Sequence, residues 1–422
     1  MKNLWTTLPP LLSDNFGLIE VVNASDGCAV IDDSGEFRLD GSHGGGQDER
    51  RRGSGFDGGS GGRYSERGGF GGRGGHGGGS GERGGGRGGH GGRRGGKGGS
   101  SRIAVSGASS QDVTTGTREI LLQAFRDVQM RCDPRFVLFS AGPCGAMIGT
   151  DLAEIAETVS RDNQIPAMAV DLTGQKTYDV GISKTTEAMA KLLALPAEKT
   201  PGAINILGAT ALDWAAADVS GVRDWAVRQG YQVLAQPGGS VTSAQLEVMG
   251  KAQCNLVTSV SGLAAARYLQ TKFGTPYVAA APFGLEQCGG LARLLEGGAQ
   301  PENTERAGAE ALIIGEQFTA NAVREALERK GVVQSADVAT FFLLDKAYAR
   351  VGDRKIKGEA DVRALLNSGK YRLIAADPLL RPLLQERCRW IDLPHRALNL
   401  YTKAEGISLL ESGLDNWLEQ HV

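Results

Sequence analysis

The chain has 422 residues, a formal net charge of −2 at pH 7 and 41% hydrophobic residues. This is enough to bury several cores, but no run approaches the roughly 18 apolar residues of a membrane helix, so no membrane partner is expected. The six cysteines are scattered without a CxxC pair, and the first fifteen residues lack the apolar core of a secretory signal. A disulfide-rich secreted protein is therefore excluded, and we expect a cytoplasmic protein with reduced thiols.

The small net charge hides two parts of opposite sign. Residues 41–100 hold 31 of the 63 glycines, ten arginines, one lysine and only five acidic side chains. The other 362 residues carry 35 basic and 43 acidic side chains, which argues against a nucleic-acid-binding body. At roughly 150 residues per domain, this body predicts two or three domains.

Residues 41–100 are predicted to be a disordered, RGG-like insertion. Half of this tract is glycine and it has almost no aliphatic residues, so it cannot offset the entropy lost on ordering. Three interpretations stay open. The tract binds RNA through arginine, with Phe56, Tyr64 and Phe70 interleaved for stacking; it is a solvated low-complexity insertion; or it is an artefact of GC-rich DNA read out of frame.

After residue 100, short apolar runs alternate with amphipathic stretches. Strands that are apolar throughout and separated by helices indicate parallel sheets covered on both faces, so a doubly wound α/β fold is predicted. The predicted strands are 136–140, 167–171, 203–208, 231–236, 255–260, 277–281, 311–315, 338–344 and 372–377. The predicted helices are 117–131, 151–162, 185–195, 219–229, 243–252, 262–273, 318–330, 360–368 and 379–387.

These strands are too many for one sheet. Pro201-Gly202 and Pro301 mark breaks near residues 200 and 300. We therefore predict three Rossmann-like domains: residues 1–40 with 101–200, residues 201–300, and residues 301–422, the last ending in a C-terminal helix.

Helix-start signals support this division. Asp151 is a candidate N-cap, and Glu154 stands three residues later at the spacing of a capping box. Thr117 and Ser261 are comparable N-cap candidates for the helices that follow them.

Local signatures of common chemistry are missing from the sequence. It contains no P-loop, no G-x-G-x-x-G that opens a helix after a strand, no G-x-S-x-G and no H-E-x-x-H. Three of the five histidines lie in the glycine tract, which makes a histidine triad or a histidine-rich zinc site improbable. His395 follows a predicted strand and is interpreted as a hydrogen-bonded loop histidine.

The cysteines offer few metal ligands. Cys132 and Cys144 flank the strand 136–140, so about 17 Å of extended chain separates them and they cannot share a metal. Cys144 lies at the carboxyl end of its strand, where open α/β sheets bind ligands. Cys288 is a second candidate, whereas Cys28, Cys254 and Cys388 are interpreted as core or packing residues.

The order of these segments resembles the nitrogenase component 1 family, of the molybdenum-iron protein α/β-chain type, and more closely its nitrogenase-like oxidoreductase relatives. The stretches that carry the resemblance are "LPPLLSDNFGLIEVVNASDGCAVIDDSG", "FSAGPCGAMIGTDLAEIA", "IPAMAVDLTG", "AINILGATALDW", "NLVTSVSGLAAARYLQTKFGTPYV", "PFG", "GEQFTANAVREALE" and "YRLIAADPLLRPLL…IDLPH". They cover residues 8–35 and 101–400 in broad terms. The resemblance implies three Rossmann-like domains around a central cleft.

The resemblance also implies multi-electron reduction. Electrons would come from an ATP-dependent iron–sulfur reductase and pass through an iron–sulfur or related metallocluster shared with a homologous component 1-type subunit. The family's cluster cysteines fall on other residues here, namely on Glu36, on Pro143 with Cys144 one residue along, and on Ser259. Serine and proline do not replace a thiolate toward iron, and Glu36 offers only a harder oxygen ligand. Cys144 is thus the metal-ligand candidate, and its alternative is a small packed thiol.

Three functions follow as hypotheses. The first is a nitrogenase component 1-type oxidoreductase subunit, with cofactor contacts expected at the strand ends in Gly142, Cys144, Gly145, Ser259, Ser261, Gly262 and Gly284. There, glycines allow close backbone approach and helix starts offer N–H donors. The second is a scaffold or assembly subunit of the same family that lost the cluster. The third is an RNA-interacting protein that acts through residues 41–100.

Overall fold

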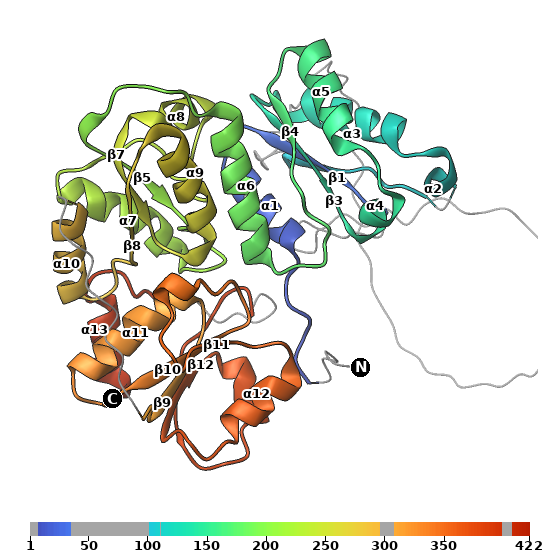
Figure 1. The fold of residues 1–422 in the computed structure, drawn as a ribbon. Helices are drawn as coiled ribbons and strands as arrows, with labels where there is room; N and C mark the ends of the chain where they lie inside the picture. Colours follow the sequence, from blue (N-terminus) through green and yellow to red (C-terminus); the bar gives the residue numbers. More distant parts are fainter. Residues whose placement is uncertain (1–6, 35–100, 110, 296–307, 399–406) are drawn as a thin grey trace, which may run out of the picture. The chain divides into compact units, whose positions relative to one another are not determined.

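The computed structural model describes residues 7–34, 101–109, 111–295, 308–398 and 407–422 (Figure 1). All of them belong to one unit of the chain, and the second unit, Arg38–Gly99, lies outside the described residues. Glu36 and the predicted glycine-rich insertion at 41–100 therefore also lie outside them. In the described segments, no helix combines the length and the apolar character needed to cross a membrane.

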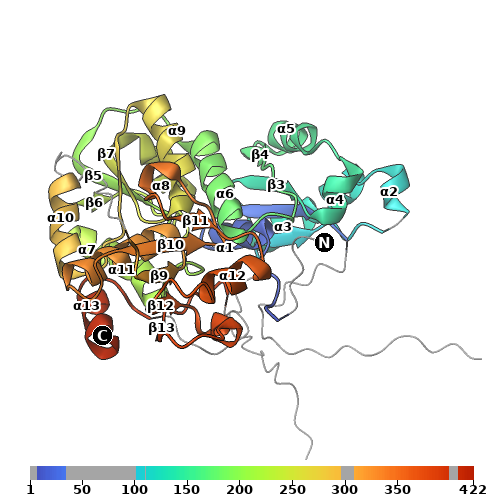
Figure 2. The same cartoon turned by 60° about the horizontal axis from the view of Figure 1, so that its bottom comes forward.

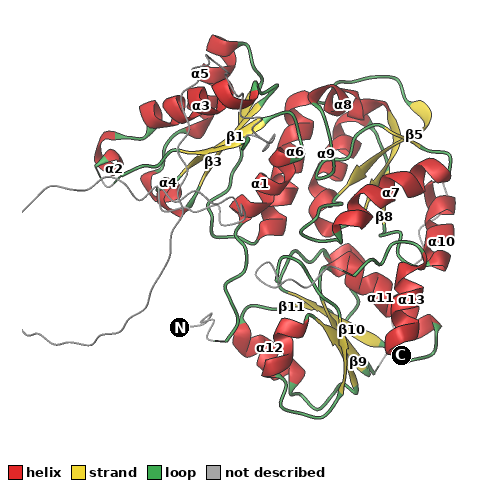
Figure 3. Ribbon diagram, turned by 180° about the vertical axis from the view of Figure 1, so that it is seen from behind, coloured by secondary structure: helices red, strands yellow, loops and turns green. Residues whose placement is uncertain are grey.

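The described residues form three purely parallel sheets with helices on their faces (Figure 3), which confirms the predicted α/β class. The strand orders are β2-β1-β3-β4, β6-β5-β7-β8 and β11-β10-β9-β12-β13. In each sheet the order reverses once, between β1 and β3, between β5 and β7, and between β9 and β12. A crevice at the carboxyl ends of such strand pairs is where doubly wound sheets bind ligands.

The first sheet consists of β1 (Cys28–Asp32), β2 (Ile103–Val105), β3 (Val137–Ala141) and β4 (Ala167–Ala169). Its helices are α1 (Asp14–Asn23), α2 (Asp112–Thr115), α3 (Arg118–Cys132), α4 (Pro143–Ile148), α5 (Leu152–Asn163) and α6 (Tyr178–Leu193). Val30 and Phe139 are register partners, and both pack with α3 and α5 in one buried cluster. The opposite face meets α1, whose Asn15 donates to the carbonyl of Ala141.

The second sheet consists of β5 (Thr200–Leu207), β6 (Gln232–Val233), β7 (Ala252–Val257) and β8 (Tyr277–Ala279). Its helical segments are α7 (Ala216–Arg228), α8 (Ser243–Glu247), η1 (Val248–Lys251), η2 (Val260–Gly262), α9 (Leu263–Phe273) and α10 (Leu285–Leu295). Helix α9 packs against α6, so α6 contacts helices that belong to two different sheets.

The third sheet consists of β9 (Ala311–Ile314), β10 (Ala336–Thr340), β11 (Arg354–Lys355), β12 (Leu373–Ala376) and β13 (Arg389–Asp392). Its helical segments are α11 (Gln317–Arg329), η3 (Lys346–Tyr348), α12 (Glu359–Leu366), η4 (Pro378–Leu383) and α13 (Ser412–His421). Helix α13 packs against α11 (Figure 2). A single cluster of buried apolar side chains continues from the second sheet into the third.

Several local predictions need correction. Asp151 caps α5 as expected, accepting from the N–H groups of Ala153 and Glu154. The Glu154 carboxylate, however, pairs with Arg118 and closes no capping box. Thr117 precedes α3 without a side-chain cap bond, and its hydroxyl donates to Asp32 instead.

Other differences concern element type and position. Ser261 lies inside η2, and α9 starts after Gly262. The predicted helix 379–387 is the 3₁₀ segment η4, which contains Pro382. Cys288, predicted in a loop, lies in α10, where it is buried and its thiol donates to the carbonyl of Pro282. Burial raises the pKa of the Cys288 thiol to about 12, so it does not offer a ready thiolate.

Candidate functional site

Polar side chains follow the strands that flank the reversal points of the second and third sheets. Asp213 and Ser259 come after β5 and β7, and Glu316 and Asp377 come after β9 and β12. His395 follows the neighbouring strand β13. All five side chains are buried. The sequence thus places ionisable groups where apolar strands end, at the edge where such sheets bind ligands.

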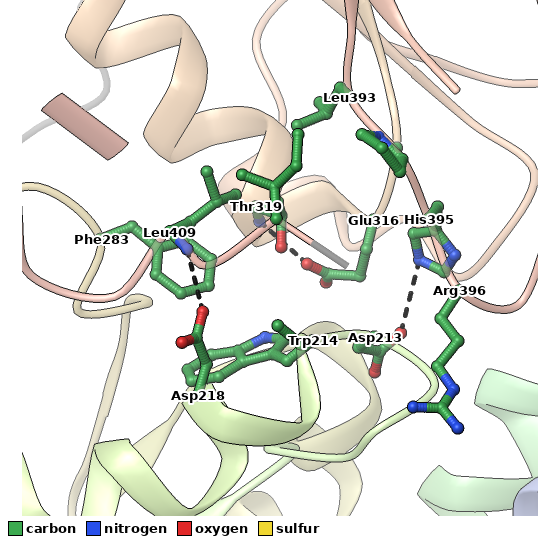
Figure 4. Close-up of a pocket in the computed structure, with 14 residues that line it drawn as sticks. Asp213, Trp214, Asp218, Phe283, Glu316, Thr319, Leu393, His395, Arg396 and Leu409 are labelled. Atoms are coloured by element: carbon green, nitrogen blue, oxygen red, sulfur yellow. Dashed lines mark hydrogen bonds and ion pairs between the residues drawn. The ribbon is translucent and has the colours of Figure 1, made fainter. Parts of the chain in front are cut away.

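Asp213 and His395 form a hydrogen-bonded cluster with a third buried residue, Tyr178. Tyr178, the first residue of α6, is fully buried, and its hydroxyl donates to Asp213 Oδ1. The same hydroxyl lies 3.3 Å from His395 Nε2. His395 Nε2 is also 3.7 Å from Asp213 Oδ1, the contact drawn as a dashed line in Figure 4. One hydroxyl therefore bridges a carboxyl group and an imidazole.

The His395 ring is fixed in orientation. It stacks on Phe342 at a centroid distance of 4.7 Å and an interplanar angle of 29°. Phe342 also meets the edge of the Tyr178 ring at 5.1 Å. The backbone N–H of His395 donates to Asp377 Oδ2 over 2.7 Å. The stacking on Phe342 and the hydrogen bond from the His395 N–H to Asp377 together hold the imidazole next to Tyr178.

Glu316 joins the third sheet to the second. It is the N-cap of α11, and its Oε2 accepts from the Thr319 N–H over 2.9 Å. Its Oε1 accepts from the N–H of Val260, the first residue of η2, over 3.0 Å. A carboxyl group that accepts two backbone N–H groups on different elements holds both in place.

A small cavity lies beside this cluster (Figure 4). Its volume is about 30 Å³, which suits one or two water molecules. Three polar atoms of lining residues, Trp214 Nε1, Thr319 Oγ1 and His395 Nδ1, are buried without a hydrogen-bond partner in the described part of the chain. The full lining consists of Asp213, Trp214, Ala215, Asp218, Phe283, Gly315, Glu316, Thr319, Leu393, Pro394, His395, Arg396, Ile407 and Leu409.

Burial favours the uncharged forms of these groups. It raises the pKa of Asp213 well above its usual value, and the charge of nearby Glu316 raises it further. Burial likewise raises the pKa of Glu316 and of Tyr178. The pKa of His395 is lowered to about 4, because the buried imidazolium would lose its hydration. Burial thus favours the uncharged form of all three groups of the cluster.

The turn from β3 into α4, with Cys144 in the first turn of α4, lies at the reversal point of the first sheet. Gly142 is the N-cap of α4, Cys144 is exposed, and Gly145 is buried. The Cys144 N–H donates to Asp33 Oδ1 over 3.2 Å. A Cβ at Gly142 would overlap the Asp33 carboxylate. The space beside this glycine is therefore filled by the Asp33 side chain of the same chain.

Of the predicted residues on the second sheet, Ser259 lies beside Asp213 of the cluster. Ser259 and Ser261 are buried, and their hydroxyl oxygens are 2.6 Å apart. Ser259 also donates to the carbonyl of Gly208 over 2.8 Å. Gly262 ends η2, and Gly284 has a φ of +84°, just before α10. None of the seven predicted cofactor-contact residues lines the cavity of Figure 4, so their assignment as cofactor contacts stays a prediction.

The residues of the first-sheet loop do not by themselves fit a metallocluster. Its carboxylates are already occupied: Asp32 accepts from Ser106 and Thr117, and Asp33 accepts from the Ser34 and Cys144 N–H groups. Within the described ranges, no three His, Cys, Asp or Glu side chains gather as a possible metal site. An iron–sulfur cluster needs about four thiolates, and this loop offers one.

Sequence reasoning missed most of the Tyr178–Asp213–His395 cluster. It identified His395 as a hydrogen-bonded loop histidine, which the contacts confirm. Tyr178 was missed because α6 starts at this residue, seven residues before the predicted helix. The cluster could have been predicted from the acidic residues that follow apolar strands, namely Asp213 and Glu316.

Comparison with known families gives one match over more than half of the chain. A model described as nitrogenase component 1 type oxidoreductase matches residues 92–338.

Curated relatives include the B-subunit of light-independent protochlorophyllide reductase. The protein of Rhodopseudomonas palustris (strain BisB5) is 26% identical over 193 residues, which are 42% of this chain and 36% of the relative. That of Cereibacter sphaeroides (strain ATCC 17025 / ATH 2.4.3) is 27% identical over 181 residues, 42% of this chain and 34% of the relative. The chain thus spans about a third of the length of these relatives.

Solved structures share the fold. "Nitrogenase Cp1 at pH 6.5" superposes with a TM-score of 0.59 at 12% identity, covering 76% of this chain and 82% of that chain. "Nitrogenase Cp1 at pH 5" gives a TM-score of 0.54 at 16% identity, covering 75% of this chain and 76% of that chain. At these identities the likeness concerns the fold alone.

Proposed function

The chain belongs to the nitrogenase component 1 type oxidoreductase family, and from this premise we propose that it is one subunit of a multi-electron reductase complex. Its partners in this proposal are a homologous component 1-type subunit and an ATP-dependent iron–sulfur reductase that supplies electrons. The family match over residues 92–338 is the observation that carries the proposal.

The buried cluster agrees with a reductive role. Reduction of a bound substrate consumes protons together with electrons, and burial raises the pKa of Asp213, which favours a proton there in a site shielded from bulk water. The cluster lies at the carboxyl ends of strands from two sheets, next to the reversal points. Proton handling is therefore a role that this chain's own residues can supply.

Metal ligation on this chain is proposed for one residue. Cys144 is exposed at the start of α4 and would contribute a single thiolate, while the partner subunit would contribute the others. The iron–sulfur cluster, when bound, would carry electrons. Because the described ligands do not fit a complete cluster, no chemical step is assigned to it.

The test is a metal analysis of the complex. The chain is co-produced with a homologous component 1-type subunit and purified without oxygen, and iron and acid-labile sulfide are measured. Both are expected in the complex. Cys144→Ser should lower the iron content, whereas Cys132→Ser, at the opposite end of β3, should leave it unchanged. A stable complex without iron or sulfide would contradict the proposal.

A cluster-less scaffold or assembly subunit is the second candidate. The observation that favours it is Ser259, which stands where the family resemblance places a ligating cysteine and whose hydroxyl is already bonded to Gly208 and Ser261. This candidate predicts a stable complex with the same partner, with neither iron nor sulfide bound in any variant.

A further inference from the structure

We propose that Asp213, Tyr178 and His395 form a proton relay that delivers one proton from the buried Asp213 carboxyl group to the cavity beside His395. The relay deepens the proposed function, because it names the residues that would supply protons for a reduction. Its use in reduction rests on that function, but its existence does not, and the experiment below needs neither a cluster nor a substrate.

Geometry provides a continuous path. The Tyr178 hydroxyl is in hydrogen-bond contact with Asp213 Oδ1 and lies 3.3 Å from His395 Nε2. Phe342 packs against both rings and keeps them together. The path ends at His395 Nδ1, a buried atom that no other group satisfies in the described structure, on a residue that lines the cavity.

The same pairs of atoms can be hydrogen-bonded in two arrangements, in which each donor and acceptor exchange roles. In the loaded state, the Asp213 O–H donates to Tyr178, the Tyr178 O–H donates to His395 Nε2, and Nδ1 carries the histidine proton. In the released state, His395 Nε2–H donates to Tyr178, Tyr178 donates to the Asp213 carboxylate, and Nδ1 is a bare acceptor. Neutral imidazole allows either tautomer.

Passing from the loaded to the released state moves one proton and no electrons. The Asp213 O–H bond breaks as Tyr178 Oη accepts its proton, and the Tyr178 O–H bond breaks as His395 Nε2 accepts in turn. The Nδ1–H bond then breaks, and its proton goes to water in the cavity. Asp213 is left as the carboxylate, and Tyr178 and His395 are neutral again.

The cavity has the properties of a water site. Its volume of about 30 Å³ holds one or two waters, and a buried water needs two to four polar partners. Trp214 Nε1–H can only donate, so it needs an acceptor such as a water oxygen. In Figure 4 the indole nitrogen lies on the side of Trp214 that faces Thr319 and Glu316.

Burial, and after it the charges of nearby acidic groups, raises the pKa of Asp213 and favours a proton on it at rest. The ionisable groups near the cluster are Asp179 on α6, Asp218 on α7, Glu316 before α11, Asp377 before η4 and Arg396 next to His395. Lys355 acts on Asp179 and Arg396 on Glu20. The acidic groups raise the cost of a second negative charge at Asp213.

The test follows the His395 tautomer by NMR in the full chain with ¹⁵N-labelled histidine, across the whole pH range in which the protein stays folded. The His395 signals are assigned from their loss in His395→Gln. We expect neutral His395 to change from the Nδ1–H to the Nε2–H tautomer as Asp213 loses its proton. One unchanging tautomer across this range in the unaltered protein would overturn the relay.

Two variants separate the relay from ordinary packing. Asp213→Asn cannot ionise, and Tyr178→Phe keeps the ring but removes the bridging hydroxyl, so both should abolish the pH-dependent tautomer change. Tyr371→Phe is the matched control, since its hydroxyl donates to Asp337 over 2.8 Å in a buried pair without histidine. The change should persist in this control, and its persistence in Asp213→Asn would contradict the proposal. A metal-free complex would instead overturn only the proposed function.

Discussion

At the scale of single residues, His395 shows how burial sets chemistry. The residue is only 5% exposed, and its ring is stacked on Phe342. The pKa of His395 is therefore lowered to about 4 from its ordinary value of 6.5. In the unfolded chain the same ring binds a proton with the ordinary pKa of 6.5. At pH values below 6.5, proton binding therefore stabilises the unfolded state relative to the folded state.

This gives a stability prediction with a defined sign. As the pH falls from about 6.5 to about 4, His395 should cost the folded protein up to about 3 kcal/mol. Over this pH range the free energy of unfolding should fall less in His395→Gln than in the unaltered protein. This holds even if the two proteins differ in stability at neutral pH. Urea unfolding at a series of pH values measures the difference, with His421→Gln on α13 as the control. Parallel pH profiles for His395→Gln and the unaltered protein would contradict the assignment.

Residue identities were only partly predictable. His395 could be recognised as a loop histidine because a strand pattern precedes it. Its partner Tyr178 comes from another sheet's helix, more than 200 residues away along the chain, and no local pattern encodes such a contact. Cys144 was placed correctly at a strand end, since that depends on local pattern alone.

At the scale of elements, α1 and α6 cross at two glycines. A Cβ at Gly17 would overlap the carbonyl of Tyr178, and one at Gly181 would overlap the carbonyl of Asp14. The two helices can lie this close because neither residue has a side chain. Since Tyr178 begins α6, this crossing also positions its hydroxyl toward Asp213.

Gly181→Ala should therefore destabilise the protein by about 1–3 kcal/mol, because backbone atoms of α1 cannot move aside cheaply. Gly289→Ala on α10 is the matched control: a Cβ there meets nothing within 4 Å. It should stabilise the protein by up to about 1 kcal/mol through helix propensity. Chemical denaturation of both variants tests this, and equal effects of the two changes would show that the helix crossing is not tight.

The elements themselves were largely predictable after residue 130. Apolar runs gave β3, β5, β7, β9 and β12 because fully buried strands need continuous apolar residues. The short strand β11 was missed, since two exposed residues carry no such pattern. Helix α4 was also missed, because a proline at its start and glycines around it resemble a loop.

At the scale of the whole molecule, repetition of one topology explains both fold and site. The first two sheets share one strand order, and each of the three reverses once between two parallel strands. The carboxyl ends at the reversals carry Asp33 and Cys144 in the first sheet, Asp213 and Ser259 in the second, and Glu316 and Asp377 in the third. The sequence predicts this arrangement in outline, but not which side chains meet.

If this chain serves a component 1-type reductase, as proposed, its complex should accept electrons from the reductase. The anaerobic complex of the chain with a homologous subunit is mixed with a reduced ATP-dependent iron–sulfur reductase, and oxidation of the reductase is followed spectroscopically. The account predicts oxidation that requires both ATP and the complex. Equal rates of oxidation with and without the complex, in the presence of ATP, would contradict it.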